Sequence, residues 1–107
     1  MERQNVSSGS PFESKIGFSR AVRVGQHIFV SETAPIGPDG KTVGLNDVYL
    51  QTKRGLEIIV QALQKTNARI ENIVRTRIFL ANIEDWEKMS DQQKWLVNVN
   101  KKARNRK

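Results

Sequence analysis

Cysteine is absent from the 107-residue chain, and histidine occurs once, at His27. Without cysteine there is no disulfide, thiolate nucleophile, iron–sulfur cluster or cysteine-ligated zinc, and a single histidine excludes every two-histidine metal motif. Ser31, the nearest serine downstream, would lie about 13 Å from His27 along a strand, too far for the two side chains to share a proton. We therefore expect no metal site and interpret His27 as a half-exposed strand residue.

Long apolar runs are lacking as well. The longest spans four residues, from Ile78 to Ala81, whereas a membrane-spanning helix needs roughly 20. Residues 1–5 contain no apolar segment of the kind that a secretory signal requires. The sequence therefore predicts no membrane association and a cytoplasmic protein.

Acidic residues are missing from the end of the chain. Residues 1–93 carry 12 basic and 11 acidic side chains, which nearly cancel, whereas residues 94–107 carry six basic side chains and no acid. The net charge of +7 is thus concentrated in this last stretch. Such a stretch is typical both of solvated disorder and of contact with nucleic acid, and these alternatives stay open.

The length fits one small domain. Residues 1–15 are rich in serine, glycine and proline and have no period, so we expect a loose lead-in. Residues 16–97 are expected to form the domain and residues 98–107 a basic C-terminal tail. A domain of this size removes only about two thirds of its surface from water on folding, so self-association is expected.

Two short alternating segments surround a two-residue turn. Residues 17–24 alternate apolar and polar side chains, Gly25-Gln26 follows, and residues 27–31 are again strand-like. This pattern predicts a β-hairpin. The Gly-Pro-Asp-Gly run at 37–40 predicts a type I turn, with a short strand at 41–43.

A helix is predicted next, with Asn46 or Asp47 as its N-cap and Asn67 as the left-handed residue that ends it. Its apolar stripe consists of Tyr49, Leu56, Ile59, Val60 and Leu63. Residues 73–80 alternate cleanly and form the clearest strand pattern in the chain, and Asn82 is predicted to cap a second helix. The predicted element order is ββ(β)αβα.

One face of the predicted strand at 73–80 mixes apolar and basic side chains. Ile73 and Phe79 share that face with Arg75 and Arg77, which is typical of neither a core nor a solvent-facing surface. We therefore expect a neighbouring subunit to cover it. The alternative is that the two arginine stems lie over the apolar side chains while their charged ends stay in water.

Four stretches resemble the RidA family, also called the YjgF or liver perchloric-acid-soluble protein family. They read GFSRAV at 17–22, FVSETAPIGPDG at 29–40, QTKR at 51–54 and VRTRIFL at 74–80. The resemblance runs from about residue 6 to residue 96 in the family's order and spacing. It implies an α+β subunit with a chorismate-mutase-like fold, a sheet with helices on one face, and a homotrimer with clefts between subunits.

The resemblance also implies a chemistry. Its best-known members hydrolyse enamine and imine intermediates such as 2-aminoacrylate to a 2-keto acid and ammonia, without a cofactor. An arginine grips the carboxylate of such a ligand through two parallel hydrogen bonds, and a glutamate relays protons to and from the attacking water. The implied ligand is a small imino or keto acid.

Carried over residue by residue, the family's cleft falls on Phe18, Ser31, Glu32 and Ser90. To these we add Arg77, from the strand face expected to be shared with a neighbour. Phe18 stands where the family usually has tyrosine, Glu32 where it has glycine and Ser90 where it frequently has asparagine. Glu32 could narrow the cleft, repel a carboxylate or contribute a new acid.

The family's arginine and glutamate belong to its last segment, which includes two closing strands. After Leu96 this chain shows no apolar alternation, so we expect the closing strands and the glutamate to be lacking. Lys101 and Arg104 are the candidates for the arginine's role, although lysine lacks the planar fork of a guanidinium. An unpaired sheet edge would favour an oligomer.

Three hypotheses for the function follow. The first is an imine deaminase whose activity is impaired or lost, and the second is an oligomer that binds a small carboxylate without turning it over. The third is RNA binding or ribonuclease-like activity through the basic tail. RNA is disfavoured because the rest of the chain has no base-stacking aromatic motif.

Overall fold

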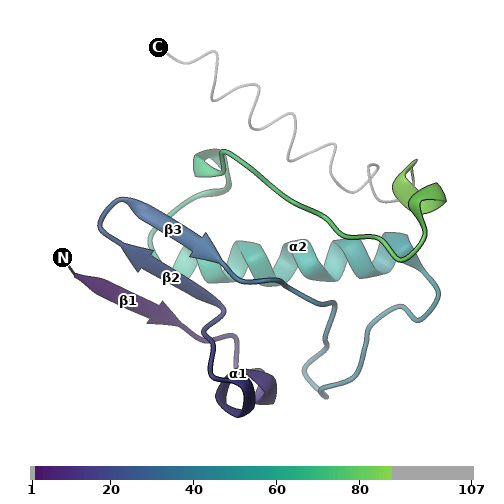
Figure 1. Ribbon diagram of the computed structural model, residues 1–107, viewed down its shortest axis with the longest axis horizontal. Coiled ribbons are helices and arrows are strands. Elements are labelled where there is room, and N and C mark those ends of the chain that lie inside the picture. The colour runs from purple at the N-terminus through teal and green to yellow at the C-terminus, as the bar shows by residue number, and fades with distance from the viewer. Residues whose placement is uncertain (1, 88–107) are drawn as a thin grey trace.

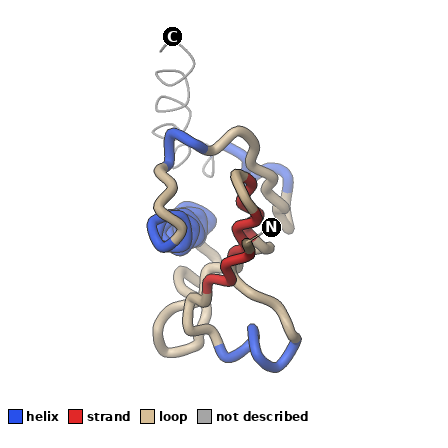
Figure 2. The backbone as a smooth tube through the Cα atoms, turned by 90° about the vertical axis from the view of Figure 1, so that its left-hand side faces the viewer, coloured by secondary structure: helices blue, strands red, loops and turns tan. Residues whose placement is uncertain are grey.

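The computed structural model describes residues 2–87 and shows a three-stranded antiparallel sheet with one long helix against it (Figure 1). The strands are β1 (Arg3–Val6), β2 (Ala21–Val24) and β3 (His27–Val30), in the spatial order β1-β2-β3. The helices are α1 (Pro11–Ile16) and α2 (Val48–Lys65), with short 3-10 helices η1 (Ile70–Asn72) and η2 (Ile83–Asp85). Helix α2 covers one face of the sheet, and α1 lies beyond the ends of the strands (Figure 2).

The predicted hairpin is confirmed. Val24 pairs with His27 across the two-residue turn, and the antiparallel register continues to Ala21 and Val30. Gly25 takes a φ of 59° at the first turn position, a conformation that a two-residue hairpin needs and that glycine adopts without a steric cost.

The prediction of a loose lead-in was wrong, because residues 1–15 contain β1 and most of α1. Strand β1 pairs with β2 over its full length, from Arg3 opposite Val24 to Val6 opposite Ala21. Helix α1 begins with a capping box in which Ser10 and Glu13 each bind the other's backbone N–H. Both elements are too short for apolar periodicity to reveal them, since their stability comes from a partner strand and a cap.

Both ends of α2 follow the sequence prediction. The side chain of Asp47 accepts a hydrogen bond from the Leu50 N–H at 3.1 Å and so acts as the N-cap. Asn67 follows the helix with a φ of 63°. The Asn67 N–H donates to Gln64 O at 3.1 Å and the Ala68 N–H donates to Leu63 O at 3.0 Å, the pair of bonds that defines a Schellman motif.

The apolar stripe of α2 is buried only where the sheet covers it. Leu56 and Leu63 are buried as expected, whereas Tyr49 is exposed. An 18-residue helix is about 27 Å long, but strands of four residues extend only about 13 Å, so the sheet cannot cover the first turns. The central core cluster consists of Val6, Ala21 and Ala62, with Val30 packed against it.

The turn at 37–40 is confirmed, since the Gly40 N–H donates to Gly37 O at 2.9 Å. The short strand expected at 41–43 is reduced to a single bridge between Ile36 and Thr42. One bridge is too little backbone pairing to hold a regular strand.

The expected strand at 73–80 is not formed. In both views this segment is extended and lies beyond β3, on the side away from β2 (Figures 1 and 2). Among the described residues, no backbone hydrogen bond joins residues 74–80 to a neighbouring segment. An alternating pattern predicts which side chains share a face, but a strand also needs a ladder partner.

Asn82 caps the next helical segment, as predicted, because its side chain accepts a hydrogen bond from the Glu84 N–H at 3.0 Å. Helix η2 follows, and residues 86–87 are helical. The remainder of the predicted second helix and the basic tail lie outside the described residues.

Candidate functional site

Three of the expected cleft residues lie at one end of the β2–β3 hairpin. Phe18 comes just before β2, and Ser31 and Glu32 come just after β3. The Ser31 N–H donates to Arg20 O at 3.0 Å, and the Ser31 hydroxyl donates to Ser19 O at 2.7 Å. These bonds extend the pairing beyond the strands and hold the two segments side by side.

Arg20 joins the same two segments through its side chain. Its Nη1 donates to Glu32 O at 2.5 Å and to the Thr33 hydroxyl at 3.0 Å. The Cζ atom of the guanidinium lies 5.2 Å from the centroid of the Phe18 ring, within range of a cation–π interaction. Arg20 thus connects the aromatic side chain on one segment with the backbone that carries Glu32 on the other.

A buried carboxylate supports this end of the hairpin. Glu13 accepts hydrogen bonds from the Ser8 hydroxyl at 2.6 Å, from the N–H groups of Ser8 and Ser10 at 3.0 and 3.2 Å, and from the Arg20 N–H at 3.2 Å. Burial alone would raise the pKa of the Glu13 carboxyl, but the hydrogen bonds from Ser8 and Ser10 outweigh that effect and hold its pKa below the ordinary value. The ionised Glu13 carboxylate therefore holds the backbone before β2 in place.

The remaining expected site residues are not joined to this cluster. Arg77 is exposed on the extended segment, and among the described residues no hydrogen bond or ion pair links it to Ser31 or Glu32. The Glu32 side chain is exposed and is not bound to another described residue. Ser90, Lys101 and Arg104 lie outside the described residues.

Sequence reasoning missed Arg20 and Glu13. For Glu13 a usable signal exists, because Ser10-Pro11-Phe12-Glu13 has the spacing of a capping box with proline at the first helical position. For Arg20 the signal is weaker. An arginine inside the GFSRAV stretch, next to the start of a strand, does not by itself predict a buried guanidinium.

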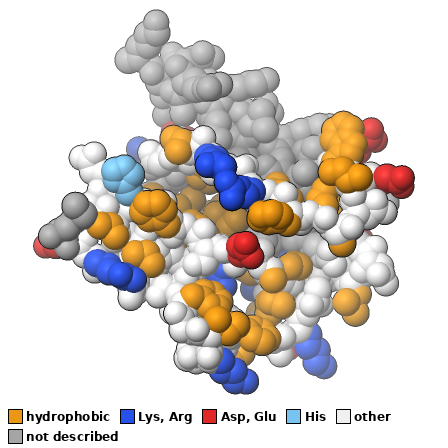
Figure 3. Space-filling view, viewed as in Figure 1, with side chains coloured by type: hydrophobic (Ala, Val, Ile, Leu, Met, Phe, Trp, Pro, Cys, Tyr) orange, Lys and Arg blue, Asp and Glu red, His pale blue; other side chains and the backbone are white. Residues whose placement is uncertain are grey.

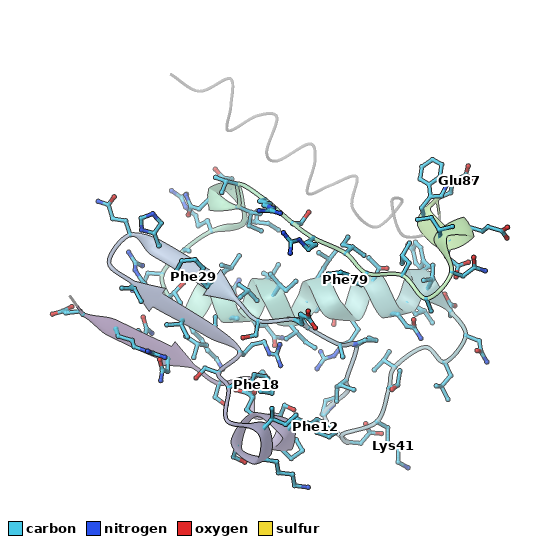
Figure 4. The ribbon with its side chains drawn as sticks, viewed as in Figure 1. Phe12, Phe18, Phe29, Lys41, Phe79 and Glu87 are labelled. Carbon is cyan, nitrogen blue, oxygen red and sulfur yellow. The ribbon has the colours of Figure 1, made fainter. Side chains whose placement is uncertain are left out.

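Apolar side chains gather on the sheet face that looks away from α2 (Figure 3). Val30 packs toward the core, so its neighbour Phe29 points to the opposite face, where it is 63% exposed. The His27 ring stacks on Phe29 with 6.4 Å between centroids. His27 is a strand residue, as expected, but it is exposed rather than half-exposed. Figure 4 places Phe29 on β3 and Phe79, which is 73% exposed, on the extended segment beyond it.

Within residues 2–87, no cluster of three or more acidic or histidine side chains is arranged to hold a metal ion. In the same part of the chain, none of the helices combines the length and apolar character needed to cross a bilayer.

Comparisons with known proteins place this arrangement in context. The family model described as Endoribonuclease L-PSP matches residues 9–106. The Streptomyces coelicolor protein SCO2049 is 36% identical over 95 residues, which cover 89% of this chain and 70% of that protein. The RutC family protein PYRAB12510 of Pyrococcus abyssi is 31% identical over 87 residues, which cover 81% of this chain and 68% of that protein.

A solved structure shows the same architecture. Rv2704 from Mycobacterium tuberculosis, a member of the YjgF/YER057c/UK114 family, has a TM-score of 0.79 and 35% sequence identity to this chain. The match covers 91% of this chain and 75% of that structure. It confirms the expected α+β, chorismate-mutase-like fold.

Proposed function

Because the chain belongs to the Endoribonuclease L-PSP family, which is also the RidA or YjgF family, we propose that it binds small imino and 2-keto acids and hydrolyses the imines only weakly. The observation that supports binding is the convergence of Phe18, Ser31 and Glu32 at one end of the hairpin. A small organic ligand is typically held between an apolar wall and a few polar groups, and these residues supply both.

In the proposed reaction, water adds to the imine carbon of a ligand such as the imine form of 2-aminoacrylate. A C–O bond forms and one water proton moves to the nitrogen, which gives a carbinolamine. The remaining hydroxyl proton then moves to the nitrogen as the C–N bond breaks, so ammonia leaves and a 2-keto acid remains. A carboxyl group that accepts the first proton and returns it to the nitrogen accelerates these transfers. Glu32 is our candidate for that group, since its carboxylate is exposed and not bound to another described residue.

We propose weak turnover because the described cluster offers no guanidinium for the ligand's carboxylate. The Arg20 guanidinium donates to the protein's own backbone and to Thr33, and no contact links Arg77 to the cluster. A Glu32 carboxylate about 4 Å from the ligand's carboxylate would cost roughly 1 to 4 kcal/mol, depending on the local dielectric. Lys101 and Arg104 remain the candidates for a compensating cation.

We propose further that the chain works as a homo-oligomer in the cytoplasm, with a trimer as the form that the family resemblance implies. The exposed side chains of Phe29 and Phe79 support this, because large aromatic side chains on one side of a small domain are typical of an interface. Arg77 would then reach a neighbouring subunit's site rather than its own.

RNA binding is the competing function, and the charges of the described residues do not favour it. Residues 2–87 carry 11 basic and 10 acidic side chains, which is nearly neutral rather than the basic surface that phosphate contacts need. The six basic residues of 94–107 lie outside the described part. We therefore prefer the small-molecule function.

The test is to incubate the protein with 2-aminoacrylate generated enzymatically and to measure pyruvate and ammonia. We expect release only slightly faster than in buffer, together with measurable binding of pyruvate. Release as fast as diffusion of the imine allows would show that turnover is not weak. The absence of pyruvate binding would remove the proposed ligand class.

A further inference from the structure

The Arg20 side chain is buried, with only 6% of its surface exposed, in a domain whose core is small. Burying a guanidinium costs free energy unless its donors find acceptors. No ion pair is formed by Arg20 among residues 2–87; its acceptors are Glu32 O and the Thr33 hydroxyl, with a longer contact of 3.5 Å to Ser31 O. Its Nε–H is buried without a hydrogen-bond partner among the described residues.

These contacts have one property in common. Every hydrogen bond from the guanidinium reaches the three consecutive residues that follow β3, and its ring contact reaches Phe18. Phe18 and Glu32 are not joined directly by a hydrogen bond or ring contact, whereas the Arg20 guanidinium contacts both the Phe18 ring and the Glu32 backbone. A planar guanidinium suits this role because it can donate in its plane while its face packs on a ring.

We propose that Arg20 is a positioning residue for the ligand site, a role that rests on the proposed function. It orients the Phe18 ring and holds the backbone of Ser31 and Glu32, so that the aromatic wall and the Glu32 carboxylate meet the ligand in one geometry. Arg20 does not touch the ligand, because its surface is almost entirely covered by the protein. Pre-organisation of this kind lowers the entropy that binding must otherwise remove.

Arg23 provides a matched control in the same strand pair. Its Nη1 donates to Thr66 O and its Nε donates to Gly25 O at 3.0 Å, so it ties the hairpin to the end of α2. None of these contacts involves residues 31–33. Substituting lysine at position 20 or 23 therefore removes the same kind of guanidinium fork, but only the first change loosens the proposed site.

The experiment compares Arg20→Lys with Arg23→Lys in pyruvate titrations followed by the backbone amide resonances of Ser31 and Glu32. We expect the Kd to rise about tenfold in Arg20→Lys, the cost of one charge-assisted hydrogen bond, and less than about twofold in Arg23→Lys. Both variants are expected to melt at a lower temperature. Equal effects of the two substitutions on the Kd, or none in Arg20→Lys, would overturn the positioning role.

A readout without ligand separates this inference from the proposed function. If wild-type protein does not bind pyruvate, the proposed function fails, and the positioning role is judged from amide exchange at Glu32 and Thr33 and from the Phe18 ring resonances. Faster exchange and a shifted ring in Arg20→Lys, but not in Arg23→Lys, support it, and unchanged signals overturn it.

A second variant is available if Arg20→Lys does not fold. Thr33→Val keeps the guanidinium and removes one of its acceptors. We expect a milder effect, with the Kd for pyruvate rising about threefold because one neutral hydrogen-bond acceptor is lost. A Kd identical to that of the wild type would contradict the inference.

Discussion

The Glu13 carboxylate accepts two hydrogen bonds from Ser8, one from its hydroxyl at 2.6 Å and one from its backbone N–H at 3.0 Å. Because these bonds and that from Ser10 favour the ionised form, the pKa of Glu13 is lower in the folded protein than in the unfolded chain. The resulting stabilisation is fully present above the unfolded pKa and is lost as the pH falls through the folded pKa. We therefore predict that the free energy of unfolding decreases from pH 5 toward pH 3.

The Glu13→Gln variant tests this in urea unfolding experiments. At pH 7 it should lower the free energy of unfolding by about 1 to 3 kcal/mol, the usual cost of weakening hydrogen bonds to a buried charge, and the acid dependence should flatten. Glu57→Gln is the matched control. The exposed Glu57 side chain forms an ion pair with the half-buried Arg54 at 3.5 Å, and its substitution should change stability by less than about 1 kcal/mol. An acid dependence retained in Glu13→Gln would contradict the prediction.

The C-terminal cap of α2 gives a second stability prediction. Asn67 holds a φ of 63°. In this left-handed region the Cβ atom of most residues costs about 1 to 2 kcal/mol, whereas glycine has no Cβ and asparagine and aspartate are tolerated. Asn67→Ala should therefore lower the thermal stability measurably, whereas Asn67→Gly should leave it unchanged or raise it slightly. Thermal unfolding followed by circular dichroism distinguishes the pair, and similar losses in both variants would argue against the left-handed cap.

The parts of the fold that were predictable are those specified by neighbouring residues. Gly25 and Gln26 define the hairpin turn, and Asp47 and Asn67 define the ends of α2, because caps and turns depend on side chains only a few positions away. Strand β1 escaped prediction because four residues give no reliable period, and its pairing partner lies 15 or more residues along the chain. The strand prediction at 73–80 is wrong for the opposite reason: its alternation is clear, but no described segment pairs with it.

Some residues of the candidate site were likewise predictable from the sequence, and others were not. Phe18, Ser31 and Glu32 were selected through the family resemblance, and the structure brings them to one hairpin end, although their role in binding stays a prediction. Arg20 could not be selected, because its role depends on contacts with residues 11 to 13 positions away. Long-range contacts of this kind leave no periodic or motif signal in a single sequence.

Two exposed aromatic side chains, one on β3 and one on the extended segment beyond it, predict an oligomer that substitutions at these positions should weaken. Phe29 and Phe79 are 63% and 73% exposed, and burying such rings in an interface contributes about 2 kcal/mol each. Phe29→Ser combined with Phe79→Ser should therefore shift the mass measured by light scattering toward the monomer. Leu45→Ser, at a loop position that is 76% exposed, is the control and should leave the mass unchanged. A stable, monodisperse monomer in the wild type would contradict the proposed oligomer.

The Glu32 carboxylate is expected to weaken binding of any ligand that carries a carboxylate of its own. Because Glu32 is exposed, solvent and salt reduce the repulsion to about 1 kcal/mol, so Glu32→Gln should lower the Kd for pyruvate about fivefold at low salt. The gain should shrink at high salt, where an electrostatic effect is screened but a change in shape is not. Glu57→Gln should leave the Kd unchanged.

If Glu32→Gln binds pyruvate no better than the wild type at low salt, Glu32 does not face the ligand's carboxylate. If it instead reduces the slow release of pyruvate from 2-aminoacrylate while improving binding, Glu32 takes part in the proton transfers proposed for it.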